Sequence, residues 1–270
     1  MLNINGNQSV GLRMTDAHDI RVCNIPYTYA VSEGDVGGHQ PFTKLGYNSD
    51  IDNVEETVWS VGGKYVFPTG GQKMEVVSTS TNDHATGTGI RTLVLTYLDT
   101  KYVKNTEIVS LKGTSSVITT STDIFRVNSI RAITAGSGSV ADGRIDCRNL
   151  ADTPIYRSLA KGYTRGRSLV YTVEAGKTLY ITDLTGSVGM ASGNRYARFT
   201  FRSNYDDVAE QTRSFLLPFA EFGIQDGVIH MPLNVPEKVP EKCDIVCSAI
   251  SDAANSDAIC TASMRGWLEW

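Results

Sequence analysis

Two short stretches of the sequence, residues 50–56 and 206–210, gather carboxylates that could hold a Ca²⁺ ion in a loop. Their members are Asp50, Asp52, Glu55 and Glu56 in the first stretch, and Asp206, Asp207 and Glu210 in the second. Neither stretch has the spaced acidic positions and the glycine of an EF-hand loop. Solvated loops are the simpler interpretation, so we predict no metal site. We leave open a pair of catalytic carboxylates like that of a glycosidase, because its two members can come from distant strands and would then have no characteristic spacing in the sequence.

The cysteines are not spaced as metal ligands. Cys243 and Cys247 are four residues apart, which suits a metal pair on a helix, but residues 242–250 have the pattern of a strand. The remaining cysteines are Cys23, Cys147 and Cys260. An odd total of five with scattered spacing argues against a disulfide framework, so we predict buried free thiols.

Other catalytic and binding motifs are missing from the sequence. The histidines form no His-x-His or His-x-x-x-His pair, and they are His18, His39, His84 and His230. No phosphate-binding loop is present, and no nucleophile elbow stands in a strand-to-helix setting. The most basic loop, residues 161–167, is best explained as solvated, and a net charge of −4 predicts no nucleic-acid footprint. We therefore predict a protein without catalytic residues or cofactor.

Aromatic side chains are the best candidates for binding contacts, since exposed aromatics contribute much of the binding energy in assemblies. Trp267 and Trp270, at the end of the sequence, are candidate interface anchors. An equally weighted alternative is that Trp267 packs in the core and that Trp270 covers one end of the sandwich. Tyr163, Tyr196 and Tyr205 are candidate receptor- or glycan-facing aromatics if they cluster at one end of the C-terminal domain, although core packing is the commoner fate of such residues.

The elements that position these residues are predicted to be β-strands. Runs rich in Val, Ile, Thr, Tyr and Phe end at Gly, Asn, Asp or Pro, and 25 glycines supply tight turns. The clearest runs are residues 73–79, 91–97, 107–111, 116–120, 125–133, 169–173, 178–183 and 196–203. The best helical stretch, residues 206–215, has no sustained apolar stripe. The pattern predicts an all-β fold.

We expect two β-sandwich or jelly-roll-like domains in tandem, preceded by an extended arm. The predicted boundaries are an arm or linker at 1–45, a sandwich at 46–148, a linker at 149–167 and a jelly-roll-like domain at 168–270. The polar start lacks the features of a secretory signal, and no apolar run approaches the roughly 20 residues of a membrane-spanning helix. We therefore expect no export and no membrane partner.

Between residues 29 and 145 the sequence contains a series of characteristic segments: FTKLGYNSDID (42–52), ETVW (56–59), GGKYVFP (62–68), VVSTSTND (76–83), GTGIR (87–91), EIVSLKG (107–113), FRV (125–127) and AGSG (135–138). In this order they resemble a family of tailed-bacteriophage virion structural proteins. The chain departs from the family pattern at Tyr97, where Gly is expected before Leu98 and Asp99. The resemblance implies a β-rich module of the virus particle with no enzymatic activity.

After residue 168 the predicted strands continue with a strand at 227–233, a proline-rich crossing at 235–240, a strand at 244–250 and a closing strand at 258–267. This order resembles the jelly roll of trimeric viral knobs and tumour-necrosis-factor-like domains. In such folds the closing strand lies inside the sandwich. This resemblance lies in the pattern of elements alone.

Together these observations predict a non-enzymatic structural protein of a tailed-phage virion, assembled in the host bacterial cytoplasm. We expect a symmetric homo-oligomer, a trimer, whose partners are other virion proteins of the capsid or tail. A tail fibre, knob or adaptor and a head decoration or cement protein are both open. The alternatives are an adhesin that binds a host-surface receptor or glycan and, less favoured, a glycan hydrolase or depolymerase.

Overall fold

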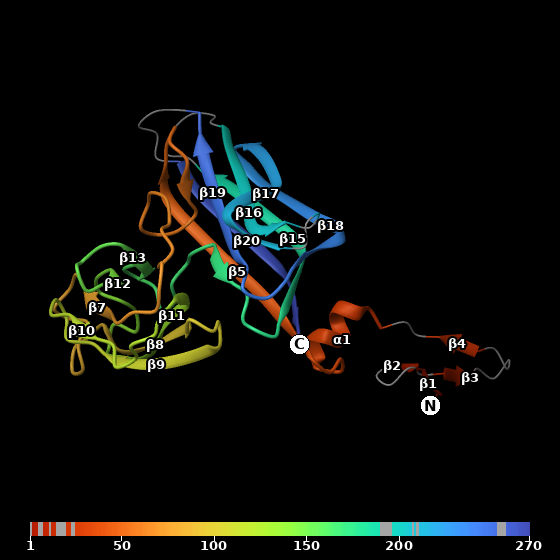
Figure 1. Ribbon diagram of the computed structural model, residues 1–270, viewed down its shortest axis with the longest axis horizontal. Helices are drawn as coiled ribbons and strands as arrows, with labels where there is room; N and C mark the ends of the chain where they lie inside the picture. The colour runs from red at the N-terminus through yellow and green to blue at the C-terminus, as the bar shows by residue number, and fades with distance from the viewer. Residues whose placement is uncertain are drawn as a thin grey trace.

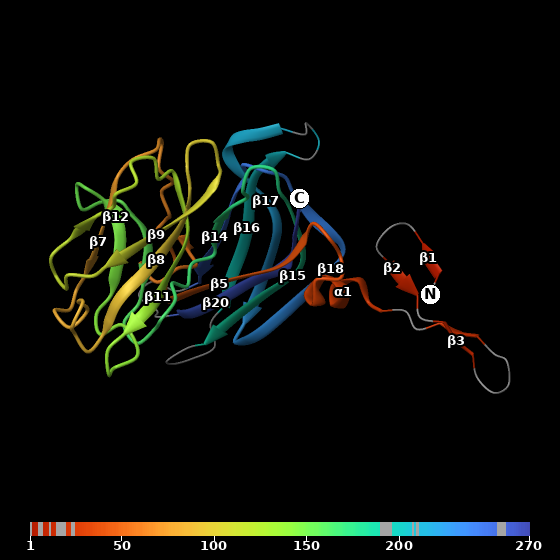
Figure 2. The same cartoon turned by 90° about the horizontal axis from the view of Figure 1, so that it is seen from below.

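The computed structural model of the chain describes residues 25–189, 196–206, 208, 211–252 and 258–270, together with four short strands nearer the N-terminus. These strands are β1 (Leu2–Ile4), β2 (Gln8–Val10), β3 (Leu12–Met14) and β4 (Ile20–Val22). The remaining strands build two β-sandwiches that lie side by side (Figures 1 and 2). The prediction of an all-β sandwich fold is confirmed.

The larger sandwich is made of two facing sheets. One has the order β18 (Gly227–Val239), β15 (Thr178–Gly189), β20 (Ala258–Glu269), β5 (His39–Ile51). The other has the order β14 (Val170–Thr172), β19 (Asp244–Ser251), β16 (Tyr196–Asp206), β17 (Gln211–Gln225), with β6 (Glu56–Thr57) also paired to β19. The strands β14, β15 and β16 lie in alternate sheets, and so do β17, β18, β19 and β20, whereas β16 and β17 form a hairpin within one sheet; this is the order of a jelly roll. The predicted closing strand, β20, lies inside its sheet between β15 and β5.

The smaller sandwich packs a four-stranded sheet on a three-stranded one. The first has the order β10 (Val117–Ile118), β7 (Met74–Ser78), β12 (Ile145–Asn149), β13 (Ile155–Leu159). The second has the order β11 (Arg126–Ala135), β8 (Ile90–Leu98), β9 (Lys104–Ser110). Each sandwich has its own apolar core: Phe199 and Met264 are buried in the jelly roll, and Leu93 and Ile130 in the smaller sandwich.

The domain boundaries differ from the predicted ones because the smaller sandwich is inserted into the jelly roll. The prediction that residues 1–45 form an arm was wrong from His39 onward, where β5 begins and pairs with β20. The predicted first sandwich, residues 46–148, starts with the rest of β5 and with β6, which both belong to the jelly roll. The predicted linker, residues 149–167, contains β13, which pairs with β12. The chain thus leaves the jelly roll after β6 and returns to it at β14.

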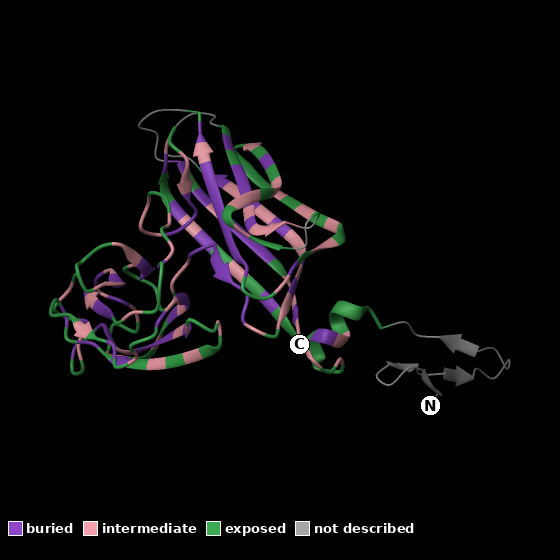
Figure 3. Ribbon diagram, in the orientation of Figure 1, coloured by how far each residue is buried: buried purple, intermediate pink, exposed green. Residues whose placement is uncertain are grey.

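The two strands at one edge of the jelly roll, β17 and β18, also differ from expectation. Residues 211–225 form a long strand although the sequence FLLPF (215–219) has no alternation. The predicted proline-rich crossing is instead the end of β18, which runs to Val239. Prolines are tolerated there because an edge strand can lose the N–H groups that face away from its neighbour. Figure 3 shows that β17 and β18 are mostly exposed or half-buried, whereas β19, inside its sheet, is buried along almost its whole length.

One helix, α1 (Tyr27–Glu33), occurs in the described part of the chain and was not predicted. It packs on the jelly roll through buried Val31 and through the ring of Tyr27, which meets Trp267 edge-on at 5.3 Å between centroids. The helix ends at Gly34, whose φ of 80° lies in the left-handed region that favours glycine. No helix of the described residues is long and apolar enough to cross a membrane.

Four cysteines are free and buried, as predicted, and Cys23 lies outside the described residues. Burial raises the pKa of the Cys147 thiol to about 12, and it does the same for Cys260. A thiol whose folded pKa is raised contributes stability that is present below its unfolded pKa of about 8.5 and is lost as pH rises toward the folded value. These thiols therefore favour the folded state at neutral pH and less so in alkali.

We predict that the free energy of unfolding decreases above about pH 9, and that it decreases less steeply with pH in the Cys147→Ala variant than in the parent protein. The stability difference between the two should shrink by roughly 1.4 kcal/mol per pH unit in that window, because the variant lacks one titrating thiol. Urea denaturation at several pH values measures this. Parallel declines for the two proteins would contradict the prediction.

Candidate functional site

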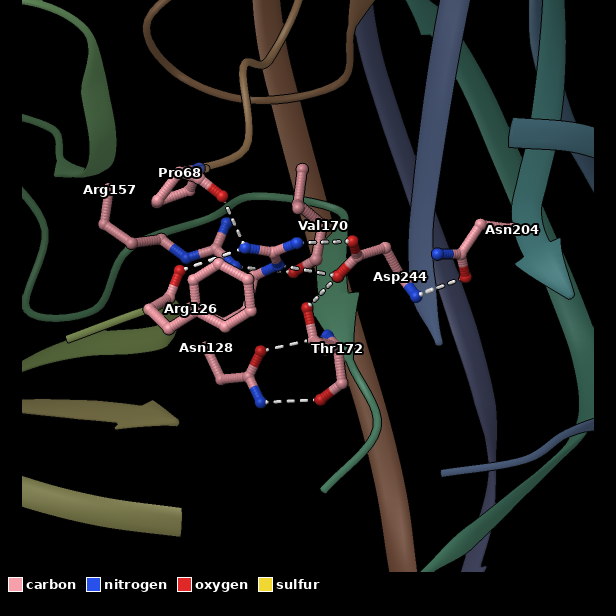
Figure 4. A network of polar contacts seen from close by, with 9 residues as sticks. Pro68, Arg126, Asn128, Arg157, Val170, Thr172, Asn204 and Asp244 are labelled. Atoms are coloured by element: carbon pink, nitrogen blue, oxygen red, sulfur yellow. Dashed lines mark hydrogen bonds and ion pairs between the residues drawn. The ribbon is translucent and has the colours of Figure 1, made fainter. Parts of the chain in front are cut away.

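An ion pair between Arg126 and Asp244 joins the two sandwiches. Arg126 opens β11 of the smaller sandwich, and Asp244 opens β19 of the jelly roll. Arg126 donates from Nε to Oδ1 at 2.9 Å and from Nη2 to Oδ2 at 3.0 Å, so the pair is bidentate (Figure 4). The side chains are only 9% and 8% exposed. A buried charge of either sign is costly without its partner, so this pair fixes the two sandwiches in one relative position.

Further hydrogen bonds surround this ion pair and complete the contact between the two sandwiches, which we call the joint. The hydroxyl of Thr172 donates to Asp244 Oδ1 at 2.5 Å, and Asn204 Oδ1 accepts from the Asp244 backbone N–H at 2.8 Å. The side-chain amide of Asn128 donates to the Thr172 carbonyl at 2.8 Å and accepts from its N–H at 3.0 Å (Figure 4). The Asn128 side chain thereby satisfies the backbone N–H and carbonyl groups of Thr172 in β14, which a neighbouring β-strand would otherwise bond.

Two further basic side chains, Arg157 and Lys44, lie at the joint. Arg157, 2% exposed, donates to the Ser168 hydroxyl at 2.5 Å and to the Val170 carbonyl at 2.7 Å. Lys44 of β5 donates to the Asn128 carbonyl. Burial holds the pKa of Lys44 well below its usual range, with a further lowering from the positive charge of Arg157. Burial also lowers the pKa of Arg157. The joint is therefore rich in buried polar groups that hold structure together.

The opposite side of the jelly roll is formed by β17 and β18, and we call these two strands the open side. They lie on the far side of the jelly roll from the smaller sandwich (Figures 1 and 2). Large apolar side chains are exposed there, with Phe215 at 58%, Val228 at 72% and Val235 at 82%. At 15 and 13 residues the strands are long for sheet edges, which proteins usually keep short or protect.

The core of the jelly roll is also incomplete on the open side. Ile229, Met231 and Leu233 of β18 pack against the core but are only partly buried, whereas Leu179 and Ile181 of the neighbouring strand β15 are fully buried. Near these residues the register of β18 against β15 shifts, so that Pro232 faces Asp183 and Glu237 faces Ile181. The four residues between Pro232 and Glu237 therefore bulge from the sheet.

The predicted receptor-facing tyrosines do not form one cluster. Tyr163 lies in a loop of the smaller sandwich, where its ring stacks 3.7 Å from the guanidinium of Arg167. Tyr47 of β5 covers the same guanidinium at 4.0 Å, so Tyr163 takes part in the contact between the sandwiches. Tyr196 and Tyr205 begin and nearly end β16, so they lie about 30 Å apart at opposite ends of the jelly roll.

The two predicted anchors differ in their surroundings. The ring of Trp267 stacks on Tyr180 at 5.4 Å and contacts Tyr27, so it holds α1 on the sheet. Trp270 is 59% exposed, with the ammonium of Lys177 4.7 Å from its ring centroid. Trp270 stays a candidate interface anchor, while Trp267 acts within the chain.

The carboxylates and histidines take part in local contacts. Glu55 pairs with Arg202 at 2.6 Å and with Lys64 at 3.9 Å, and Asp206 pairs with Arg213 at 2.6 Å. His230 of β18 lies 2.8 Å from Asp183 of β15, whereas His18, Asp207 and Glu210 lie outside the described residues. Within the described ranges, no group of three or more potential ligands is arranged to hold a metal ion.

No protein-family model and no curated protein matches the sequence. Solved structures with some likeness include that of the infectious bursal disease virus Gt strain, at 11% identity and a TM-score of 0.22, covering 90% of this chain and 77% of that chain. The Gx strain of the same virus gives 9% identity and a TM-score of 0.23, covering 90% and 76%. The structure of T=1 particles derived from infectious bursal virus gives 11% identity and a TM-score of 0.21, covering 86% of this chain and 69% of that chain. TM-scores of 0.23 or lower carry no argument about this chain.

We predict that Arg126→Ala lowers the free energy of unfolding by about 3–5 kcal/mol, because Asp244 would remain buried without its partner. Arg198→Ala is the matched control: its ion pair with Glu221 is longer, at 3.9 Å, and about half exposed. The control should lose less than about 1 kcal/mol. Chemical denaturation measures both variants. Equal losses would show that the buried pair does not stabilise the joint.

Proposed function

We propose that the chain is a non-enzymatic structural protein of a tailed-phage virion that works as a symmetric homo-oligomer, a trimer. The observation that carries the proposal is the open side, where Phe215, Val228 and Val235 are exposed on two long edge strands. Long sheet edges that carry exposed apolar side chains and have no cover tend to associate with other chains. Assembly would cover them.

The joint supports the same function. An oligomer of fixed symmetry needs subunits of fixed shape, and the Arg126–Asp244 ion pair joins two sandwiches that have separate hydrophobic cores. The resemblance of residues 29–145 to virion structural proteins points to the particle as the place of assembly. The jelly roll agrees with this role by analogy only, because capsid proteins, lectins and cupins all use it. A tail fibre, knob or adaptor and a head decoration or cement protein would each use such an oligomer.

One observation favours the adhesin as a second function. A polar hollow of about 570 Å³ lies in the smaller sandwich, away from the open side. It is lined by Thr79, Ser80, Thr81, Thr114, Asp142, Gly143, Arg144 and Lys161. Hydroxyl, carboxylate and cationic groups together suit a hydrophilic ligand such as a host-surface glycan. Binding on a glycan array that is lost in Ser80→Trp would support this role, and an empty array would remove it.

We predict that light scattering of the purified protein gives the mass of a trimer, and that Phe215→Ser combined with Val228→Ser lowers that mass. The control combines Ile108→Ser with Ile118→Ser, which removes apolar residues that are equally exposed, at 67% and 55%, but lie on the smaller sandwich. The control should keep the parent mass, because its residues lie outside the open side. A monomeric parent protein at micromolar concentration would overturn the proposal.

A further inference from the structure

A hollow of about 270 Å³ lies between α1 and the sheet that contains β5, β20 and β15, and we call it the α1 hollow. Thr28 and Val31 of α1 line one side of it. Figures 1 and 2 show α1 beside the start of β5, at one end of the jelly roll. The volume is near the lower end of the range for small-molecule sites, about 300 Å³, which suits a ligand of a single ring.

Three polar side chains from neighbouring strands form a row on the sheet side of the α1 hollow. The register places Thr43 of β5 opposite Arg265 of β20, and Arg265 opposite Asp183 of β15. Residues directly opposite each other share a face of the sheet. The next residues, Leu184 and Met264, belong to the core, so the row faces away from it. A hydroxyl, a guanidinium and a carboxylate therefore lie next to one another in the hollow.

A bulge in β15 brings a second hydroxyl to the same place. From Ile181 to Asp183 the strand advances two residues while β20 advances one, so Thr182 is the extra residue. Thr182 and Asp183 both line the α1 hollow, although consecutive residues of a regular strand face opposite sides. The Thr182 hydroxyl donates to Asp183 Oδ2 at 2.7 Å, and His230 Nε2 lies 2.8 Å from Oδ1. The Thr182 contact, followed by that of His230, lowers the pKa of Asp183, which is therefore charged at neutral pH.

Two hydrogen-bond donors of the α1 hollow lack acceptors in the described part of the chain. Arg265 makes no hydrogen bond or ion pair with any described residue, and its charge acts on Asp183 only through space. Its guanidinium therefore keeps five N–H donors for a ligand. Trp267 also lines the hollow, and its buried indole N–H has no acceptor among the described residues. A buried donor without an acceptor is costly, so the hollow favours a ligand that supplies one.

The groups of the α1 hollow together match an acidic sugar. A guanidinium binds a carboxylate through two parallel hydrogen bonds, and an ionised Asp183 accepts hydrogen bonds from hydroxyl groups. The hydroxyls of Thr43 and Thr182 donate or accept, and the indole N–H donates to a sugar oxygen. A simple carboxylic acid would leave Asp183 without hydroxyl donors. A neutral sugar would leave Arg265 without its anion.

We propose that the α1 hollow binds a hexuronic acid, a six-membered sugar ring with one carboxylate. Arg265 binds the carboxylate of the sugar, Asp183 accepts from its ring hydroxyls, and Trp267 donates its indole N–H to a ring substituent. This inference goes beyond the proposed assembly and does not depend on it, because all these residues belong to one copy. The α1 hollow is also separate from the polar hollow of the smaller sandwich, which shares none of its residues.

The first test is calorimetric titration of the full-length protein with D-glucuronate, D-galacturonate and D-mannuronate. We expect saturable binding of at least one of these acids, and a loss of affinity of about tenfold or more in Arg265→Ala, because a charge-assisted contact is removed. The control is Arg198→Ala, whose guanidinium is 49% exposed and lies on β16 of the other sheet. The control should keep the parent affinity. No saturable binding of any of the three acids, or equal losses in the two variants, would overturn the inference.

A second titration separates an acidic sugar from a simple anion or a neutral sugar. Acetate carries the carboxylate without the ring, and D-glucose carries the ring without the carboxylate, so each should bind about tenfold or more weakly than the hexuronic acid. Asp183→Asn, folded by circular dichroism, should weaken the binding of the acid as well. Acetate or glucose that binds as tightly as the acid would overturn the inference. Light scattering of Arg265→Ala should give the parent mass, so that a failed titration leaves the proposed assembly standing.

Discussion

The buried pair of Arg126 and Asp244 is the interaction on which the arrangement of this molecule depends. Because the smaller sandwich is inserted between β6 and β14, its chain leaves and re-enters the jelly roll on one side. Two covalent connections alone would allow the sandwiches to change their relative angle. The ion pair, supported by Asn128 and Thr172, removes that freedom. If the two sandwiches moved apart, Arg126 and Asp244 would separate, and a charge left buried without its partner is costly.

The insertion also explains why the two sides of the jelly roll differ. The side formed by β5, β6 and β14 carries the smaller sandwich, and Lys44 and Arg167 reach across it. The side formed by β17 and β18 has no such cover in the described chain, and its core is incomplete at Ile229 and Met231. The jelly roll thus has one edge that the smaller sandwich covers and a second edge, the open side, that no described part of the chain covers. This asymmetry suits a subunit that must be rigid in itself and yet associate with others.

Strands with regular alternation could be read from the sequence, and strands defined by distant partners could not. Residues 91–97 were predicted and form the middle of β8, because each residue's own pattern reveals its buried face. β5 was taken for part of an arm, since its place depends on pairing with β20, more than 200 residues later. β17 was missed because an edge strand with one open face needs no strict alternation. The helix α1 was missed because it is short and is held by Trp267 and not by its own sequence.

The site shows the same limit. The free thiols followed from the number and spacing of the cysteines, and the inner position of the closing strand followed from the resemblance to jelly-roll domains. Arg126 and Asp244, in contrast, are separated by 118 residues with nothing in their spacing to link them. The available signal was a lone arginine within an otherwise apolar strand start, Phe125 to Val127, where a charge would require a buried partner. The tyrosines illustrate the reverse case. Their type suggested a shared binding face, but their positions along β16 and in a distant loop separate them.

The central claim is that the open side is buried by assembly while the joint is buried in every copy. Hydrogen–deuterium exchange of the purified protein, measured above and below its dissociation concentration, tests this most directly. The account predicts that amides of β17 and β18 gain protection on assembly, while β14 and the start of β19 are equally protected in both states. Unchanged exchange at β17 and β18, with new protection on the smaller sandwich, would contradict it.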